Sequence, residues 1–251
     1  MSYSYRANPA LAASSFEATK VVSQDDRSER RPRAKPLLRR YEAAYLNAAG
    51  ETTQFSRIAP AVPMFEGAFN AIARSTLITT TNGPVAVEDL QPGDLIETAE
   101  TGPEPLLWIG NLMFYPLRDD QPLRTDPLVR LTADAMGFGR PMQDLLLGTG
   151  ARVWSRRDND FVEPSALADG ESIFELAPVA PITVYHLCLS GPRTILANGV
   201  ALQTYQPDPT LLRNLTPEMR ALFLSLFPNA AVLNGFGIMR GRAAPAQTRA
   251  A

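Results

Sequence analysis

The sequence predicts an all-β fold, and three observations lead to this prediction. From Ser75 onward, short runs of strand-forming residues alternate with turn residues. Two of the turns, Asn82-Gly83 and Ser190-Gly-Pro192, have the composition of hairpin turns. The runs follow one another along the chain without a convincing helical period between them. We therefore expect a domain built from short antiparallel strands.

The expected strands can be taken in chain order. Residues 76–81 alternate between apolar and polar, Asn82-Gly83 reverses the chain, and residues 85–87 resume a strand, which predicts a hairpin. Pro92-Gly93 then turns the chain into a strand over residues 94–98. Nearby Gly or Pro residues bound most of the further strands, which are expected at 106–109, 128–131, 144–147, 152–154, 182–189 and 193–196.

The segment before this β domain has a different composition. Residues 1–68 show little sustained periodicity, and seven basic residues between positions 27 and 40 accompany a single acid, Glu29. We expect a flexible Arg-rich leader, which is either a solvated linker or a segment that contacts acidic surfaces such as phosphate or a protein partner. Within it, residues 40–50 are compatible with two or three helical turns that end at Gly50.

The C-terminal segment, residues 209–251, is expected to hold one helix and a tail. Thr216-Pro-Glu218 supplies an N-cap, a first-turn proline and a first-turn acid, and the apolar stripe that follows extends to about Phe227. The expected organisation is therefore a leader over 1–68, a β domain over 69–208 and a helix with its tail over 209–251.

Composition excludes several classes of chemistry. The single cysteine, Cys188, cannot form an intrachain disulfide, and one histidine, His186, cannot build a Cys/His zinc cluster, so no metal or cofactor is expected. The net charge of −2 disfavours a general nucleic-acid binder, although residues 1–69 carry +3 and the remainder −5. Neither a signal peptide nor an uninterrupted membrane span is recognisable, so we expect a cytoplasmic protein, with export by a non-classical route left open.

Four phrases of the sequence resemble the Hedgehog/intein (Hint) domain, in the form found as a stand-alone module in many bacterial proteins. They are Ser75-Thr-Leu-Ile-Thr-Thr-Thr-Asn-Gly83, Val87-Glu-Asp-Leu-Gln-Pro-Gly-Asp-Leu-Ile96, Trp108-Ile-Gly110 and Ala197-Asn-Gly199. The second phrase is the most specific, and the resemblance extends over about residues 69–208. It implies a horseshoe of long, bent β-hairpins.

The resemblance also implies a chemistry, autocatalytic peptide-bond cleavage. In the family, a Cys or Ser at the first residue attacks the preceding carbonyl, and a histidine protonates the departing nitrogen. Counting back from Thr76, the nucleophile position is occupied by Ala71. The family's internal hydroxyl and imidazole fall on Gly148 and Ala151, and the late histidine falls on Pro192. We expect a degenerate active site and a Hint-domain protein that has lost autoprocessing and serves as a structural or interaction module.

The alternative is a self-cleaving protein with a relocated nucleophile. Ser75 and Thr76 are nearby hydroxyls, and His186 is the only imidazole that could serve as their base. A shift of four residues along a strand moves a group by about 13 Å, well beyond the ~3 Å reach of an attack. His186 lies within a predicted strand, on the same face as Cys188, where a buried structural histidine is the simpler interpretation.

Overall fold

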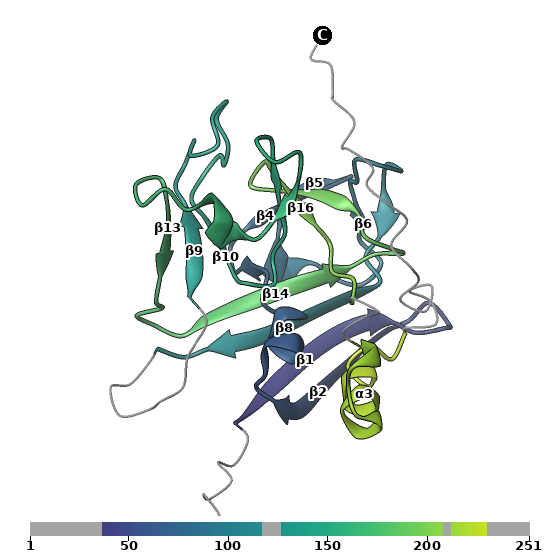
Figure 1. Cartoon of the computed structure of the whole chain (residues 1–251). Helices are drawn as coiled ribbons and strands as arrows, with labels where there is room; N and C mark the ends of the chain where they lie inside the picture. The colour runs from purple at the N-terminus through teal and green to yellow at the C-terminus, as the bar shows by residue number, and fades with distance from the viewer. Residues whose placement is uncertain (1–36, 117–126, 208–211, 230–251) are drawn as a thin grey trace, which may run out of the picture. The chain divides into compact units, whose positions relative to one another are not determined.

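The computed structural model describes residues 37–116, 127–207 and 212–229. In these residues the chain forms two antiparallel sheets, which confirms the predicted all-β fold (Figure 1). The first sheet has the order β13-β9-β10-β3-β14-β8-β1-β2. The second sheet has the order β12-β11-β16-β15-β4-β6-β7, and β5 pairs with β4 beside this path.

The strands of the first sheet come from widely separated parts of the chain. In the order of the sheet they are β13 (Ile173–Leu176), β9 (Leu128–Leu131), β10 (Leu145–Leu147), β3 (Ile72–Ala73), β14 (Ile182–Cys188), β8 (Trp108–Phe114), β1 (Leu38–Leu46) and β2 (Thr52–Pro60).

The second sheet contains one of the two hairpins expected from the turn residues. Its strands are β12 (Asp160–Val162), β11 (Val153–Ser155), β16 (Val200–Gln203), β15 (Thr194–Ala197), β4 (Leu77–Thr80), β5 (Gly83–Ala86), β6 (Leu95–Ile96) and β7 (Glu104–Pro105). The turn at Asn82-Gly83 joins β4 to β5, as predicted. The hairpin expected around Ser190-Gly-Pro192 is wrong, because β14 pairs with β8 in the first sheet while β15 pairs with β16 in the second.

Helical segments are short. They are α1 (Pro63–Gly67), α3 (Pro217–Leu224) and the 3-10 turns η1 (Val87–Asp89) and η2 (Pro164–Leu167). α3 begins as expected, because the side chain of Thr216 accepts a hydrogen bond from the N–H of Met219. Among the described helices, none has the length and apolar character that a membrane span requires.

The flexible leader expected over residues 1–68 is wrong for residues 37–68, and the expected helix over 40–50 is wrong as well. β1 and β2 form an antiparallel hairpin, and β1 also pairs with β8. The buried side chains of Tyr41 and Ala43 alternate with exposed Glu42, which is the period of a strand. Pairing with a strand some 70 residues away therefore overrides the local helix propensity of this alanine-rich stretch. Residues 1–36 lie outside the described residues.

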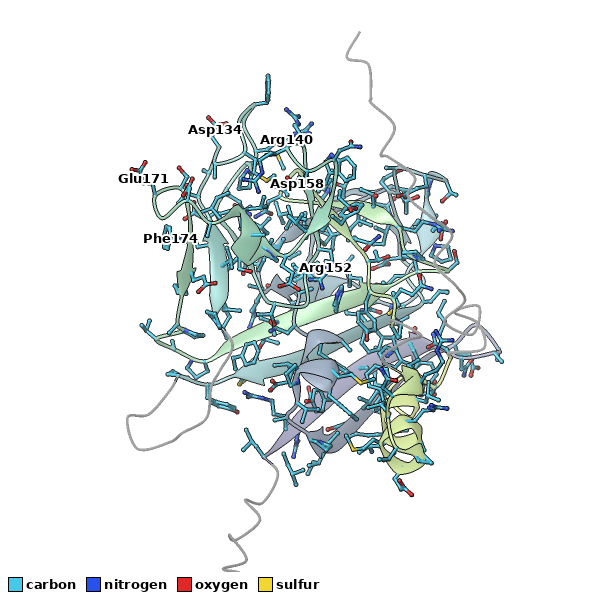
Figure 2. The ribbon with its side chains drawn as sticks, viewed as in Figure 1. Asp134, Arg140, Arg152, Asp158, Glu171 and Phe174 are labelled. Atoms are coloured by element: carbon cyan, nitrogen blue, oxygen red, sulfur yellow. The ribbon has the colours of Figure 1, made fainter. Side chains whose placement is uncertain are left out.

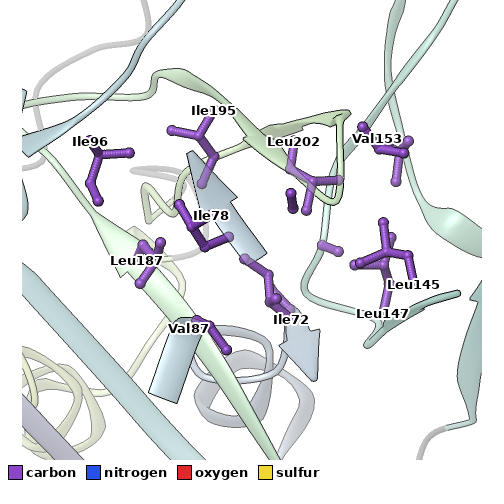
Figure 3. Packing of buried hydrophobic residues seen from close by; sticks show 14 of the residues in the cluster. Ile72, Ile78, Val87, Ile96, Leu145, Leu147, Val153, Leu187, Ile195 and Leu202 are labelled. Carbon is purple, nitrogen blue, oxygen red and sulfur yellow. The ribbon is translucent and has the colours of Figure 1, made fainter. Parts of the chain in front are cut away.

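Two hydrophobic clusters form the core. The first contains the branched aliphatic residues shown in Figure 3, such as Ile72, Ile78 and Leu147. The second is aromatic and includes Tyr41, Phe65, Phe69, Trp108, Phe223 and Phe227.

Trp108 is the centre of the aromatic cluster. Its ring centroid lies 5.1 Å from that of Phe69 and 4.8 Å from that of Phe227. Its indole N–H donates to the carbonyl of Leu226 at 2.9 Å. The cluster thus joins the strand β8 to the segment that precedes residue 70 and to the turn after α3.

Removing one aromatic ring from this cluster should be costly. Phe69 is fully buried, so we expect Phe69→Ala to lower the free energy of unfolding by about 3–5 kcal/mol in urea denaturation. The matched control is Phe138→Ala, since Phe138 is 86% exposed and its replacement should change stability by about 0.5 kcal/mol or less. Equal effects of the two substitutions would contradict the placement of Phe69 in the core.

Candidate functional site

The peptide bond between Asn70 and Ala71 lies at the centre of the site that the resemblance implies. It connects α1 to β3, and both residues are buried. The carbonyl of Asn70 accepts a hydrogen bond from the N–H of Gly150 at 2.7 Å. The N–H of Ala71 donates to the carbonyl of Tyr185 at 3.0 Å, and its carbonyl accepts from the N–H of Gly148 at 3.0 Å. Backbone groups therefore hold this peptide on both sides.

The loop over residues 148–151 makes most of these contacts. It follows β10 and is closed by a hydrogen bond from the N–H of Ala151 to the carbonyl of Gly148. The side chain of Ala151 packs in the same hydrophobic cluster as Ala71. The structure thus brings together the three positions 71, 148 and 151 that the family resemblance assigns to one site. Each carries either a methyl group or no side chain, so none can attack a carbonyl or move a proton.

Gly148 and Asn70 have complementary shapes. A Cβ atom at residue 148 would lie 1.7 Å from Oδ1 of Asn70 and 2.6 Å from its backbone oxygen. The Asn70 side chain, which donates from Nδ2 to Oγ1 of Thr149 at 3.2 Å, therefore occupies the space next to residue 148. The role of Asn70 cannot be predicted from the sequence, because no local pattern connects it with a glycine 78 positions further along the chain.

Gly150 is required for a different close approach. A Cβ atom there would lie 2.2 Å from the carbonyl oxygen of Gly67 and 2.6 Å from that of Asn70. Both obstacles are backbone atoms, which cannot rotate away. Gly67 at the end of α1 and Asn70 are therefore packed directly against the loop.

His186 contacts this loop from β14. Its Nδ1 accepts a hydrogen bond from the N–H of Leu187, so the proton of the neutral ring lies on Nε2, which is 3.3 Å from the carbonyl oxygen of Gly150. The pKa of His186 is lowered to about 3, mainly by burial; the bond to Gly150 acts in the opposite direction, and the charge of Arg152 adds to the lowering. Arg152 lies beside the loop (Figure 2) and donates to the carbonyl of Ala151. His186 is therefore a neutral donor that supports the loop.

Ser75 and Thr76 have other partners. The N–H of Ser75 donates to Oε2 of Glu88 at 2.7 Å, and its hydroxyl lies 3.4 Å from Oε1 of the same carboxylate. Partial burial alone raises the pKa of Glu88, but the hydrogen bonds from Ser75 and Arg74 outweigh this effect and lower it. Thr76 is buried, and its carbonyl accepts from the N–H of Val87. The contacts of both residues therefore stabilise the start of β4.

Pro192 belongs to a polar cluster around Glu104. Its carbonyl accepts from the guanidinium of Arg193, whose Nε donates to Oε1 of Glu104 at 2.5 Å. The hydroxyl of Ser190 donates to the other oxygen of Glu104. Burial raises the pKa of Glu104, but the hydrogen bonds from Ser190, Thr101 and Arg193 lower it overall. The contacts of Pro192 thus hold a turn rather than the peptide between Asn70 and Ala71.

Comparison with known proteins identifies the family. A family model described as the Hint domain matches residues 70–209, which is more than half of the chain. This chain belongs to the Hint domain family. The resemblance of the four sequence phrases is thereby confirmed. Among curated protein sequences, none matches the chain.

Solved structures similar to this Hint domain include three proteins of low sequence identity. The bacterial intein-like domain from Clostridium thermocellum is 18% identical with a TM-score of 0.40, and the alignment covers 54% of this chain and 99% of that one. The gp41-1 intein is 15% identical with a TM-score of 0.36 and coverages of 54% and 98%. A DnaB intein from Synechocystis sp. PCC 6803 is 14% identical with a TM-score of 0.35 and coverages of 54% and 99%.

A side chain at residue 148 of this Hint domain should destabilise it. We expect Gly148→Ala to lower the free energy of unfolding by about 1–3 kcal/mol, because the new methyl group collides with Asn70. Adding Asn70→Ala should restore part of this loss but not all of it, because the backbone oxygen of Asn70 stays in place.

The measurement is a double-mutant cycle in urea with the parent, both single variants and the double variant. We expect the two substitutions to be coupled by about 1 kcal/mol or more. Additivity of the two single effects within about 0.5 kcal/mol would contradict the complementary fit of Asn70 and Gly148.

The buried histidine should make stability depend on pH above the range where carboxylates titrate. The pKa of His186 is lowered from 6.5 to about 3 in the folded protein, so the unfolded chain binds a proton that the native protein does not. The stabilisation that comes from this difference in proton binding is fully present above pH 6.5, and it is lost as the pH falls. We expect a loss of about 2 kcal/mol between pH 7 and pH 5.

Urea denaturation across this pH range measures the loss, and NMR supplies an independent control. His186 is the only histidine, so its ring resonances in untagged protein can be assigned without ambiguity. They should not shift between pH 8 and pH 5. A titration midpoint near 6.5 would show that the ring is accessible and is not held as described.

Proposed function

We propose that this chain is a Hint-domain protein that has lost autoprocessing and acts as a structural or interaction module. The observation that supports this proposal most strongly is the residue at the nucleophile position. Ala71 is buried at the peptide that an active relative would cleave, and its methyl group has no lone pair with which to attack the carbonyl of Asn70.

Within residues 37–116, 127–207 and 212–229, no titratable side chain is hydrogen-bonded to the nitrogen that would depart. The N–H of Ala71 is bound to the backbone of β14, through the carbonyl of Tyr185. The imidazole of His186 is neutral at ordinary pH and its Nε2 faces the carbonyl of Gly150. A group with a pKa near 3 is protonated in only about one molecule in 10⁴ at pH 7, so it is poorly matched to general acid catalysis.

The segment that autoprocessing would release is part of the folded core. β1 pairs with β8 from Glu42 to Tyr45, and the rings of Tyr41, Phe65 and Phe69 are fully buried in the aromatic cluster. A leaving segment in an active protein has to separate from the domain once the bond is cut. Residues 37–70 would instead remain packed against Trp108 and α3, which supports a permanent structural role for this segment.

A relocated nucleophile is the second candidate, and one observation favours testing it. Ser75 has a positive φ of 69°, which is uncommon for serine, and its hydroxyl lies close to the carboxylate of Glu88. However, the lowered pKa of Glu88 makes this carboxylate a weak base. The observed hydrogen bonds of His186 are with Gly150 and Leu187 rather than with Ser75.

The proposal predicts that this protein does not cleave itself. Full-length protein incubated for hours with excess dithiothreitol or hydroxylamine should yield no fragment cut before residue 71, because no thioester or ester forms there. Fragments are to be measured by intact mass under denaturing conditions, since a cut leader would stay associated with the folded domain.

Two variants make the experiment decisive. Ala71→Cys restores the nucleophile alone and should give at most trace cleavage, because general acid assistance worth about 10²–10⁴-fold is still missing. Adding Ala151→His should increase the release. Cleavage of the parent protein at Asn70-Ala71 or at Arg74-Ser75 would overturn the proposal, and its loss in Ser75→Ala would identify Ser75 as the relocated nucleophile.

We also propose that this chain is cytoplasmic. We further propose that its Arg-rich leader contacts an acidic surface, such as that of a protein partner. Of the Arg-rich stretch, Arg39 and Arg40 lie in the described residues, and Arg39 forms an ion pair with Glu66. This arginine therefore contributes to the fold, and the remaining basic residues before residue 37 lie outside the described residues. The proposed contact between the leader and an acidic surface concerns those residues.

A further inference from the structure

β2 forms one end of the first sheet. Its nine residues pair with β1, and in the part of the chain that the structure describes no other strand pairs with it (Figure 1). An edge strand presents a row of backbone N–H and C=O groups that can pair with another strand. The hairpin that was expected to be a flexible leader thus gives the sheet a long outer edge.

The hydrogen bonds at the two ends of the hairpin show which backbone groups point outward. The N–H of Asn47 donates to the carbonyl of Glu51, and the N–H of Ala61 donates to that of Leu37. In an antiparallel ladder, hydrogen-bonded and non-hydrogen-bonded pairs alternate. The odd-numbered residues of β2 therefore bond to β1, and the even-numbered residues Thr52, Gln54, Ser56 and Ile58 direct their backbone groups away from it.

This edge lacks the features that usually prevent strand addition. β2 contains one charged residue, Arg57, and its proline, Pro60, is its last residue. The residues with outward backbone groups are exposed, and Ile58 is 63% exposed. The buried aromatic rings of α3 and the turn after it contact Phe65, Phe69 and Trp108, in the cluster that also holds the buried side chain of Ala59 from β2.

We propose that β2 pairs with β2 of a second copy of this chain, antiparallel and with Phe55 at the twofold axis. In this register Thr52 lies opposite Ile58 and Gln54 lies opposite Ser56 of the other copy. All four residues then use their outward N–H and C=O groups. The pairing joins the first sheets of the two protomers into one continuous sheet through an isologous contact.

The side chains of β2 suit this register at each position. Two β-branched residues, Thr52 and Ile58, face each other, and two aromatic rings meet at Phe55, next to the ring of Tyr45 of each copy. Arg57 faces Thr53, so like charges are not placed opposite each other. These features favour a second copy of the same strand over an unrelated partner.

Registers shifted by two residues are less favourable, because each places an unsuitable residue opposite one end of the paired segment. A shift of two residues in one direction pairs Thr52 with Pro60, which has no N–H to donate. The same shift in the other direction pairs Ile58 with Gly50, which lies in the turn before β2 with a φ of +78°. Each of the four residue pairs in the register centred on Phe55 can therefore form two hydrogen bonds, whereas the end pairs of the neighbouring registers cannot.

Analytical ultracentrifugation of the full chain tests the proposal. The parent should sediment as a species of twice 27.4 kDa that dissociates on dilution. Ser56→Pro removes an outward N–H without touching the bonds to β1, and should weaken the dimer by about tenfold or more. The matched control Ser56→Ala keeps the N–H and should dimerise like the parent. Circular dichroism melts of both variants verify folding.

Cysteine cross-linking checks the register independently. Cys188 is buried, so a single introduced cysteine is the reactive thiol under mild oxidation. Phe55→Cys should form a disulfide-linked dimer, because the two residues are directly opposite each other. Arg57→Cys should not, because its two copies lie about 13 Å apart along the strands. A monomeric parent across the micromolar range, or cross-linking at residue 57 but not at 55, would overturn the proposal.

Discussion

The packing of Phe69 against Trp108 is the contact on which the rest of the structure depends. Phe69 precedes Asn70 directly, so burying its ring fixes the position of the peptide that an active relative would cleave. The same Trp108 contacts the turn after α3, through the ring of Phe227 and the carbonyl of Leu226. One ring on β8 therefore connects the segment upstream of the Hint domain, the site and the segment downstream of it.

Much of the fold was predictable because its signals are local. The turn at Asn82-Gly83 and the capped start at Thr216 depend on residues a few positions apart, and the structure has both where the sequence placed them. The family resemblance supplied what local patterns could not, namely that residues 71, 148 and 151 belong to one site. Hydrogen bonds from Gly148 and Gly150 to the backbone at Ala71 and Asn70 agree with that grouping.

The hairpin of β1 and β2 could not be predicted in this way. Its alanines favour a helix, and the strand that overrides this preference, β8, is distant in the sequence. The contact between Asn70 and Gly148 could not be predicted for a related reason. An asparagine and a glycine 78 positions apart carry no shared pattern, although their atoms are in contact in the fold. Long-range complementarity of shape is a property of the folded chain, and no window of the sequence displays it.

The absence of a side chain at residues 148 and 150 has two consequences that cannot be separated. It removes the hydroxyl that the family resemblance places at residue 148, and it provides the room in which Asn70 and the end of α1 lie. Two of the atoms nearest to Gly150 are backbone oxygens, so the upstream segment could not keep this position if a side chain returned there. The proposed loss of autoprocessing and the tight packing of the upstream segment therefore depend on the same residues. A side chain could therefore return to residue 148 or 150 only if the backbone before Ala71 moved.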